Sequence, residues 1–267
     1  MGIAMQNPEH HEATVIQLDN ASVRYRMLQE RVTTFKEYAL RWLRGRNTYT
    51  HFWALRNVSL SIKQGETVGI IGANGAGKST VLKVIANILL PTEGKVQIRG
   101  SVAPILELGS VFDPELTGRE NIYLNGAMLG HSRRVMEKKL DSLIEFAGIG
   151  NFMDAPLRNY SDGMVARLAF AIATDVDADI LLIDEILAVG DKDFQLKCFA
   201  RIATFKDVGT TLVIVSHDLG QIERLCRRVI WLEHGRIRED GSPKEILARY
   251  MQESAHTLLD RTQVDLG

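Results

Sequence analysis

The sequence has little cysteine, almost no net charge and no long apolar run. Its 267 residues include two cysteines, Cys198 and Cys226, whose separation does not match a metal site, so we expect reduced thiols in a cytosolic protein. The formal net charge of −1 provides no bulk attraction for nucleic acid. Because no apolar stretch is long enough to cross a bilayer, any membrane role would need a separate membrane partner.

Signal-peptide features, internal repeats and low-complexity tracts are also missing. Residues 1–12 are polar, and we expect them to form a flexible N-terminus. Residues 251–267 are expected to form a C-terminal tail that is loose from Ser254 onward. An apolar fraction of 45% and a charged fraction of 24% are ordinary for a soluble protein, so we predict one large domain over residues 13–250.

A glycine-rich segment over residues 72–80 is the most informative motif of the chain. It fits the phosphate-binding pattern G-x-x-x-x-G-K-[ST] at every fixed position, with the residues Gly72, Ala73, Asn74, Gly75, Ala76, Gly77, Lys78, Ser79 and Thr80. Glycines let successive backbone N–H groups turn toward an anion. Lys78 adds charge for the β- and γ-phosphates of ATP, and the Ser79 hydroxyl is a ligand for Mg²⁺. A predicted strand over 66–71 and a predicted helix over 79–86 place the phosphates at a helix N-terminus.

Two other apolar strands end in residues that can serve phosphate chemistry. The strand over 180–183 is followed by Asp184 and Glu185, which we expect to reach Mg²⁺ and a water beside the γ-phosphate, respectively. The strand over 211–215 is followed by His217, which is placed to contact the γ-phosphate or hold Glu185. Ligands of such sheets bind outside the carboxyl ends of the strands, so we predict that these residues meet the glycine-rich loop.

Short apolar runs alternate with helical patterns along the chain, which predicts an α/β fold with a mostly parallel sheet. A helical subdomain over about residues 109–165 interrupts this alternation. We expect strands over 15–18, 22–25, 58–62, 95–99, 180–183 and 211–215, a hairpin over 228–238, and helices over 164–174 and 219–226.

A second inserted segment, residues 27–45, has the pattern of an amphipathic helix. Apolar residues recur at steps of four and three, and the other face is basic. An aromatic loop over 49–53 is expected to follow. The helix can pack on the surface of its own domain, or it can contact a membrane subunit or anionic headgroups.

Residues 160–164 read Tyr-Ser-Asp-Gly-Met and precede a helical pattern. Ser161 is a favourable N-cap, and Asp162 suits the positive end of a helix. Taken alone, this segment indicates only where a helix begins.

The order of these motifs resembles that of ATP-binding cassette (ABC) ATPases over about residues 15–250. The resemblance implies a P-loop ABC ATPase fold: a RecA-like core with a mostly parallel sheet, an antiparallel β subdomain and an inserted helical subdomain. It also implies a dimer of two copies that sandwiches two ATP molecules with Mg²⁺. The phosphate loop of one copy would face the signature segment of the other, which here comprises Ser161, Asp162, Gly163 and Met164. Asp191 matches the aspartate of the family's interface loop.

Residues 160–164 differ from the family's usual signature, Leu-Ser-Gly-Gly-Gln, and these differences restrict the resemblance to one subfamily. Tyr160, Asp162 and Met164 replace its leucine, third-place glycine and glutamine, and Glu107 replaces the usual glutamine after the first sheet. With residues 117–121 and 188–191, these variants resemble the ATPase subunits of polysaccharide exporters. Asp162 brings an extra carboxylate near the expected triphosphate, and like charges repel.

The subfamily resemblance implies that ATP hydrolysis drives export of a lipid-linked glycan such as O-antigen, capsule, teichoic acid or galactan. Glu185 and Lys78 would act in hydrolysis, and Glu107 would lie at the base of the insertion that passes motion to the partner. That partner would be an integral membrane permease in two copies. The chain would then lie peripherally on the cytoplasmic face of the membrane, with no nucleic-acid partner and no carbohydrate-binding domain after the cassette.

The aromatic residue that stacks on adenine remains open. Tyr25 matches the family's usual tyrosine, but the inserted helix would displace it from the phosphate loop, so Phe52 and Trp53 are alternatives.

Two other functions explain fewer of the sequence motifs than ATP-driven export does. A soluble ABC protein acting on DNA or ribosomes usually has coiled coils or tandem cassettes, and a P-loop small-molecule kinase would leave the signature segment and His217 unexplained.

Overall fold

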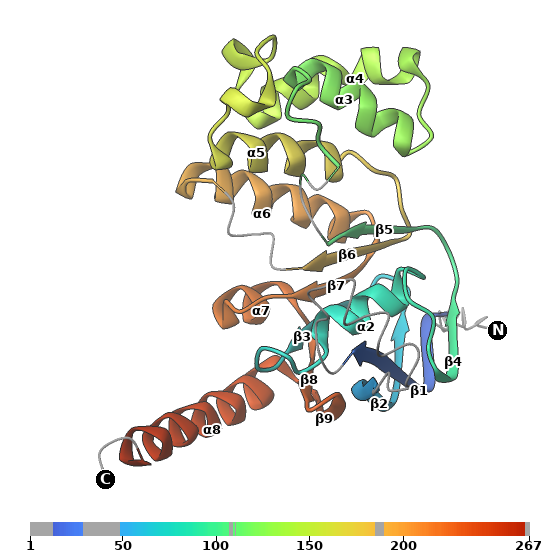
Figure 1. Ribbon diagram of the computed structural model, residues 1–267, viewed down its shortest axis with the longest axis vertical. Coiled ribbons are helices and arrows are strands. Elements are labelled where there is room, and N and C mark those ends of the chain that lie inside the picture. Colours follow the sequence, from blue (N-terminus) through green and yellow to red (C-terminus); the bar gives the residue numbers. More distant parts are fainter. Residues whose placement is uncertain (1–12, 29–48, 107–108, 110, 185–189, 265–267) are drawn as a thin grey trace, which may run out of the picture.

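The computed structural model describes residues 13–28, 49–106, 109, 111–184 and 190–264, which contain two sheets (Figure 1). The larger sheet has six strands in the order β5-β6-β7-β3-β8-β9. Its pairings are parallel except for that of β8 with β9. In chain order the strands are β3 (Thr67–Ile71), β5 (Val102–Ile105), β6 (Ile180–Asp184), β7 (Thr211–Val215), β8 (Arg228–Glu233) and β9 (Arg236–Gly241).

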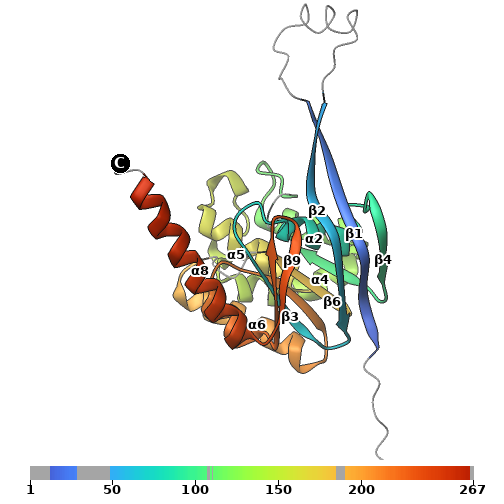
Figure 2. The same ribbon diagram turned by 90° about the horizontal axis from the view of Figure 1, so that it is seen from below.

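The smaller sheet is antiparallel and has the strand order β2-β1-β4. Two of its strands are long, β1 (Thr14–Leu28) and β2 (Tyr49–Lys63), and the third is β4 (Glu93–Ile98). Figure 2 shows β1 and β2 as a twisted ribbon that extends beyond the body of the molecule.

Helix α2 (Lys78–Ile85) packs between the two sheets, where one apolar core forms from β1, β2, α2 and one face of the larger sheet. The other face is covered by α6 (Lys192–Asp207), α7 (Leu219–Leu225) and the start of α8 (Pro243–Val264). Strands β3 and β7 are buried along their whole length. Burial on both faces explains why these strands read as continuous apolar runs in the sequence.

The helical subdomain forms a third core of its own. It consists of α3 (Gly118–Met128), α4 (Arg133–Ala147), two 3₁₀ turns (Gly150–Phe152 and Leu157–Asn159) and α5 (Asp162–Ala173). Thr117 and Glu120 make a capping box at the start of α3, and Gly148 ends α4 in the left-handed conformation. The predicted insertion into an α/β sheet is therefore confirmed.

Several sequence-based expectations for individual elements were wrong. The helix predicted over 27–45 cannot begin at Met27, because β1 continues to Leu28; residues 29–45 lie outside the described part. The aromatic segment 49–53 is not a loop but the start of β2, since it pairs with the end of β1. Cross-strand pairing therefore overrides the local helical spacing.

The C-terminal segment also differs from its prediction. We expected a loose tail from Ser254, whereas α8 continues to Val264. Pro243 at the first helical position and Glu245 in the first turn favour helix initiation. None of the helices in the described ranges is both long enough and apolar enough to cross a membrane.

Candidate functional site

The phosphate loop connects the end of β3 to the start of α2, as predicted. Two of its glycines are required by their surroundings. Gly72 has a φ of 148°, and a Cβ there would collide with the carbonyl oxygen of Leu232. Gly77 has a φ of 107°, and a Cβ there would lie 2.7 Å from the carbonyl oxygen of Ala54. Since L side chains rarely adopt this conformation, glycine is the residue that fits both positions.

The start of α2 has the chemistry of an anion site. Its N-cap, Gly77, offers no side-chain acceptor, and its first turn contains no acidic residue. The buried Lys78 donates hydrogen bonds from Nζ to the carbonyl oxygens of Gly72 (2.7 Å) and Ala73 (3.0 Å), so its charge is held across the loop. N–H groups at a helix start and a neighbouring ammonium group match a polyphosphate, so the residues fit the expected ligand.

A hollow of about 360 Å³ brings the predicted site residues together. Asp184 comes from the end of β6 and His217 follows β7, and both face the same hollow as the phosphate loop. Strands β6, β7 and β3 are neighbours in the sheet, which is why residues so distant in sequence meet. The lining residues are Tyr25, Phe52, Ala54, Asn74, Gly75, Gly77, Lys78, Ser79, Thr80, Asp184, Val215 and His217.

Oxygen ligands suited to Mg²⁺ are available in this hollow. Ser79 and Asp184 both line it, and a hydroxyl and a carboxylate are the hard donors that Mg²⁺ prefers. Within the described ranges, no group of three or more His, Cys, Asp or Glu residues could hold a metal by itself. Glu185 and Glu107 lie outside the described residues.

The structure separates the three aromatic candidates for adenine stacking. Tyr25 and Phe52 are opposite each other in the register of β1 and β2, and both line the hollow. Tyr25 is therefore not displaced from the phosphate loop, contrary to our expectation. Trp53 lies on the other face of the ribbon. There the guanidinium carbons of Arg24 and Arg56 lie 5.3 and 5.9 Å from the centre of its ring.

The signature segment begins α5, away from the phosphate loop of its own chain. Ser161 caps the helix as predicted, since its Oγ accepts a hydrogen bond from the Met164 N–H at 3.3 Å. Ser161 and Asp162 are exposed, and none of the four signature residues lines the hollow. A Cβ added to Gly163 would meet no atom nearer than the Ser161 Oγ, at 3.9 Å. Packing inside the chain therefore does not require glycine at this position.

An ion pair that the sequence analysis missed connects this helix to Asp191. Asp191 Oδ1 accepts from the Phe194 N–H at 2.9 Å and so caps α6, while Oδ2 accepts from Arg167 Nη2 at 2.5 Å. The Phe194 N–H and, to a lesser extent, the Arg167 guanidinium lower the pKa of Asp191. Arg167 follows Gly163 by one helical turn, but no sequence spacing indicates that it contacts α6.

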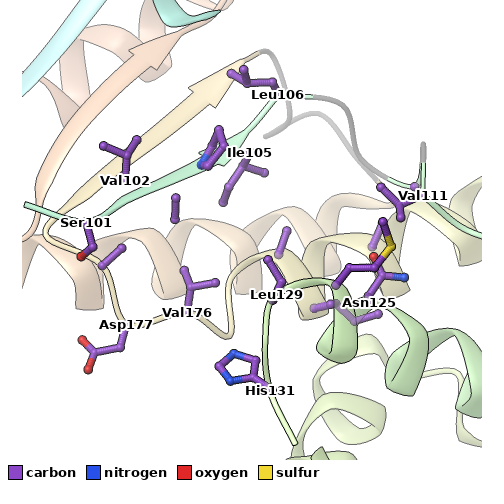
Figure 3. Close-up of a pocket in the computed structure, with 18 of the residues that line it drawn as sticks. Ser101, Val102, Ile105, Leu106, Val111, Asn125, Leu129, His131, Val176 and Asp177 are labelled. Atoms are coloured by element: carbon purple, nitrogen blue, oxygen red, sulfur yellow. The ribbon is translucent and has the colours of Figure 1, made fainter. Parts of the chain in front are cut away.

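A second hollow, of about 580 Å³, lies between β5 and the helical subdomain (Figure 3). Its walls are largely apolar and include Leu106, Val111 and Leu129. Leu106 and Gly109, which flank the undescribed pair 107–108, both line it. Glu107, which we expect to be the coupling residue, belongs to this pair and so lies outside the described residues.

Comparison with known proteins identifies the family. Residues 55–188 match the family described as ABC transporter. This chain belongs to the ABC transporter family. The cassette MJ0796, a bacterial ABC transporter cassette with a dimeric structure, superposes with a TM-score of 0.68 at 25% identity and covers 85% of this chain and 98% of its own. The expected ABC ATPase fold is confirmed, and the family is one of ATP-hydrolysing subunits.

Several similar proteins are named for export systems. The chain is 46% identical over 248 residues to the O-antigen export system ATP-binding protein RfbB of Myxococcus xanthus, covering 92% of this chain but 57% of that protein. It is 47% identical to the protein of the same name from Klebsiella pneumoniae, covering 81% of this chain and 87% of the relative. The teichoic acids export ATP-binding protein TagH of Listeria innocua is 49% identical over 199 residues, 74% of this chain and 59% of that protein.

Proposed function

We propose that this chain is the ATP-hydrolysing motor subunit of an exporter that moves a lipid-linked polysaccharide across the cytoplasmic membrane. The observation that carries the proposal is the meeting of Lys78, Asp184 and His217 in one hollow at the phosphate loop. The names of its relatives support a cargo of the O-antigen or teichoic acid type. Capsule and galactan chains belong to the same chemical class.

The polar and aromatic side chains of the hollow then have roles toward ATP. Lys78 and the first N–H groups of α2 would hold the phosphates, and Ser79 and Asp184 would hold Mg²⁺, whose charge would stabilise the transferred phosphoryl group. Tyr25, with Phe52 beside it, supports the adenine. His217 contacts the γ-phosphate, and Glu185 orients the attacking water.

A second copy of the chain completes the site. The exposed Ser161 can present its Oγ, and the start of α5 its N–H groups, to the γ-phosphate held by the partner copy. The space beside Gly163 favours close approach of an outside group. Because Asp162 adds a negative charge to this segment, we expect the contact to depend on compensation by Mg²⁺ and the helix terminus.

The membrane permease, in two copies, would contact the hollow between β5 and the helical subdomain. Its apolar lining supports this role, and so does its place between β5 and the helical subdomain, because nucleotide-driven movement of the subdomain would reach the permease there. The chain is then held on the cytoplasmic face of the membrane by its partner.

The decisive experiment replaces Glu185 by Gln and leaves the rest of the transport system intact. ATP hydrolysis should stop while ATP binding persists. Cells with this variant should lack the glycan on their surface and accumulate its lipid-linked form in the cytoplasmic leaflet of the membrane. The matched control is Glu145→Gln, which alters an exposed carboxylate on α4. Wild-type hydrolysis by the Glu185→Gln protein would contradict the catalytic role. A second outcome would contradict the export role instead: the wild-type protein hydrolyses ATP, but deletion of its gene causes no accumulation of lipid-linked glycan.

A further inference from the structure

The ribbon formed by β1 and β2 carries a basic and aromatic surface that the proposed ATP site does not use. We define this surface, the cationic face, by Arg24, Arg26, Arg56, Tyr49 and Trp53. The guanidinium carbon of Arg26 lies 3.4 Å from the centre of the Tyr49 ring. Those of Arg24 and Arg56 lie on the Trp53 ring, at 5.3 and 5.9 Å. The arginines and rings are therefore interleaved rather than scattered.

Strand register separates this face from the nucleotide hollow. Arg24 is paired with Trp53, and the next pair along the ribbon is Tyr25 with Phe52. Because successive side chains of a strand point to opposite faces, the two pairs lie on opposite sides of the ribbon. Tyr25 and Phe52 line the hollow, so the cationic face is turned away from it.

The positive charge of this face is not neutralised by neighbouring carboxylates. All three arginines are exposed, and in the described part of the chain no ion pair joins them to Asp or Glu. Elsewhere, Arg228 is paired with Glu66 and Asp240, and Arg238 with Glu233. Since the whole chain has a formal charge of −1, the cationic face is a local concentration of charge and not part of a general excess.

We propose that the cationic face binds the anionic headgroup surface of a phospholipid bilayer. Arginine is attracted to anionic lipids, and tryptophan and tyrosine favour the boundary between headgroups and acyl chains. The face lies on the ribbon that extends from the body of the molecule (Figure 2), and its three arginines are exposed. This inference does not rest on the proposed export function, because lipid contact requires neither ATP hydrolysis nor a permease.

The test is co-sedimentation of the purified full chain with vesicles, without nucleotide. Vesicles of phosphatidylcholine with phosphatidylglycerol are compared with vesicles of phosphatidylcholine alone. We expect binding to the anionic vesicles that weakens with added salt. Replacing Arg24, Arg26 and Arg56 by Gln should lower the partition constant about a hundredfold, at roughly a factor of five per arginine.

The matched control replaces three exposed cations elsewhere, Arg134, Lys138 and Lys197, by Gln. This variant should bind the anionic vesicles within about twofold of the wild type, since the charges removed lie outside the cationic face. An equal loss in both variants would show general charge attraction and overturn the proposal. Equal wild-type binding to both kinds of vesicle, or no binding, would also overturn it; the second outcome would favour a protein partner for this face.

A second measurement does not depend on the arginine variants remaining folded. With Trp42 and Trp231 replaced by Phe, Trp53 is the remaining tryptophan, and brominated phosphatidylglycerol should quench its fluorescence on vesicle addition. Quenching that disappears in high salt supports the proposal, whereas unchanged fluorescence overturns it. Affinity for a nucleotide analogue reports whether the ribbon is folded, since Tyr25 and Phe52 lie on its other face.

Discussion

The two halves of the proposed ATP site are built in opposite ways. At the phosphate loop, Gly72 and Gly77 are enclosed by the backbone of β2 and β8, and the fold itself demands glycine. At the signature segment, Ser161 is exposed and Gly163 has open space around its Cα. The first half is thus specified by contacts within one chain. Contacts within one chain do not require the residues of the second half, and the proposed contact with a second copy would explain them.

The largest effect should come from removing the charge of the phosphate-loop half. We expect Lys78→Ala to lower ATP turnover about 100- to 1000-fold, because the lysine stabilises charge on the transferred phosphoryl group. Steady-state ATPase assays check this, with Lys138→Ala, at an exposed position of α4, as the control. Comparable turnover in the two variants would contradict the assignment of the site.

The steric demand at Gly77 should appear as a loss of stability. Gly77→Ala combines a positive φ with a close contact to the Ala54 carbonyl, so we expect the free energy of unfolding to fall by about 3 kcal/mol. Urea unfolding measures this change. Gly130 also has a positive φ but no atom near an added Cβ, so Gly130→Ala should cost only about 1 kcal/mol. If the two variants lost the same free energy of unfolding, the added methyl group at residue 77 would not be in close contact with the Ala54 carbonyl.

The signature half should respond in activity and not in stability. Gly163 lies inside α5, so Gly163→Ala should leave the free energy of unfolding unchanged or raise it by up to about 1 kcal/mol. ATP turnover should nevertheless fall about tenfold, because a methyl group keeps the partner's γ-phosphate at a distance. Urea unfolding and ATPase assays on the same preparation compare the two effects. If Gly163→Ala lowered the free energy of unfolding but not ATP turnover, Gly163 would be required for stability, as Gly77 is, and the predicted difference between the two glycines would be wrong.

The smallest effect concerns the ion pair behind the signature helix. The pKa of Asp191 is lowered in the folded chain, so its ionised form stabilises the fold at pH values above its usual pKa of 3.8, and this contribution is lost as the pH falls below that value. Asp191→Asn should therefore be less stable than the wild type near neutral pH, and the difference should shrink in acid. Urea unfolding across this pH range measures it. Asp193→Asn, which removes a carboxylate from the same helical turn, is the matched control.

The local motifs made much of the site predictable. The phosphate loop and His217 follow buried parallel strands, Asp184 ends one, and their predicted roles depend on the strand end that carries them. Parallel strands bring such ends to one edge, so the grouping could be predicted without knowing the strand order. The start of α5 at Ser161 was predictable for a similar reason, since an N-cap is a local feature.

Other features depend on contacts that no local pattern reveals. The spacing of apolar residues over 27–45 predicted a helix, but Met27 and Leu28 pair with β2 as part of a strand. The edge strand β5 was not predicted, because it has four residues and contains Pro104. The pair of Arg167 with Asp191 joins two helices that are adjacent only in the folded chain.

The sequence by itself determined the phosphate chemistry and the α/β class, because both arise from residues within a few positions of one another. The tertiary structure decided which aromatic residues face the hollow at the phosphate loop. A shift in register between β1 and β2 at Ala54 directs Tyr25 and Phe52 to the hollow and Trp53 to the opposite face. A single extra residue in one strand reverses which side chains share a face, and that choice is made by pairing across the sheet.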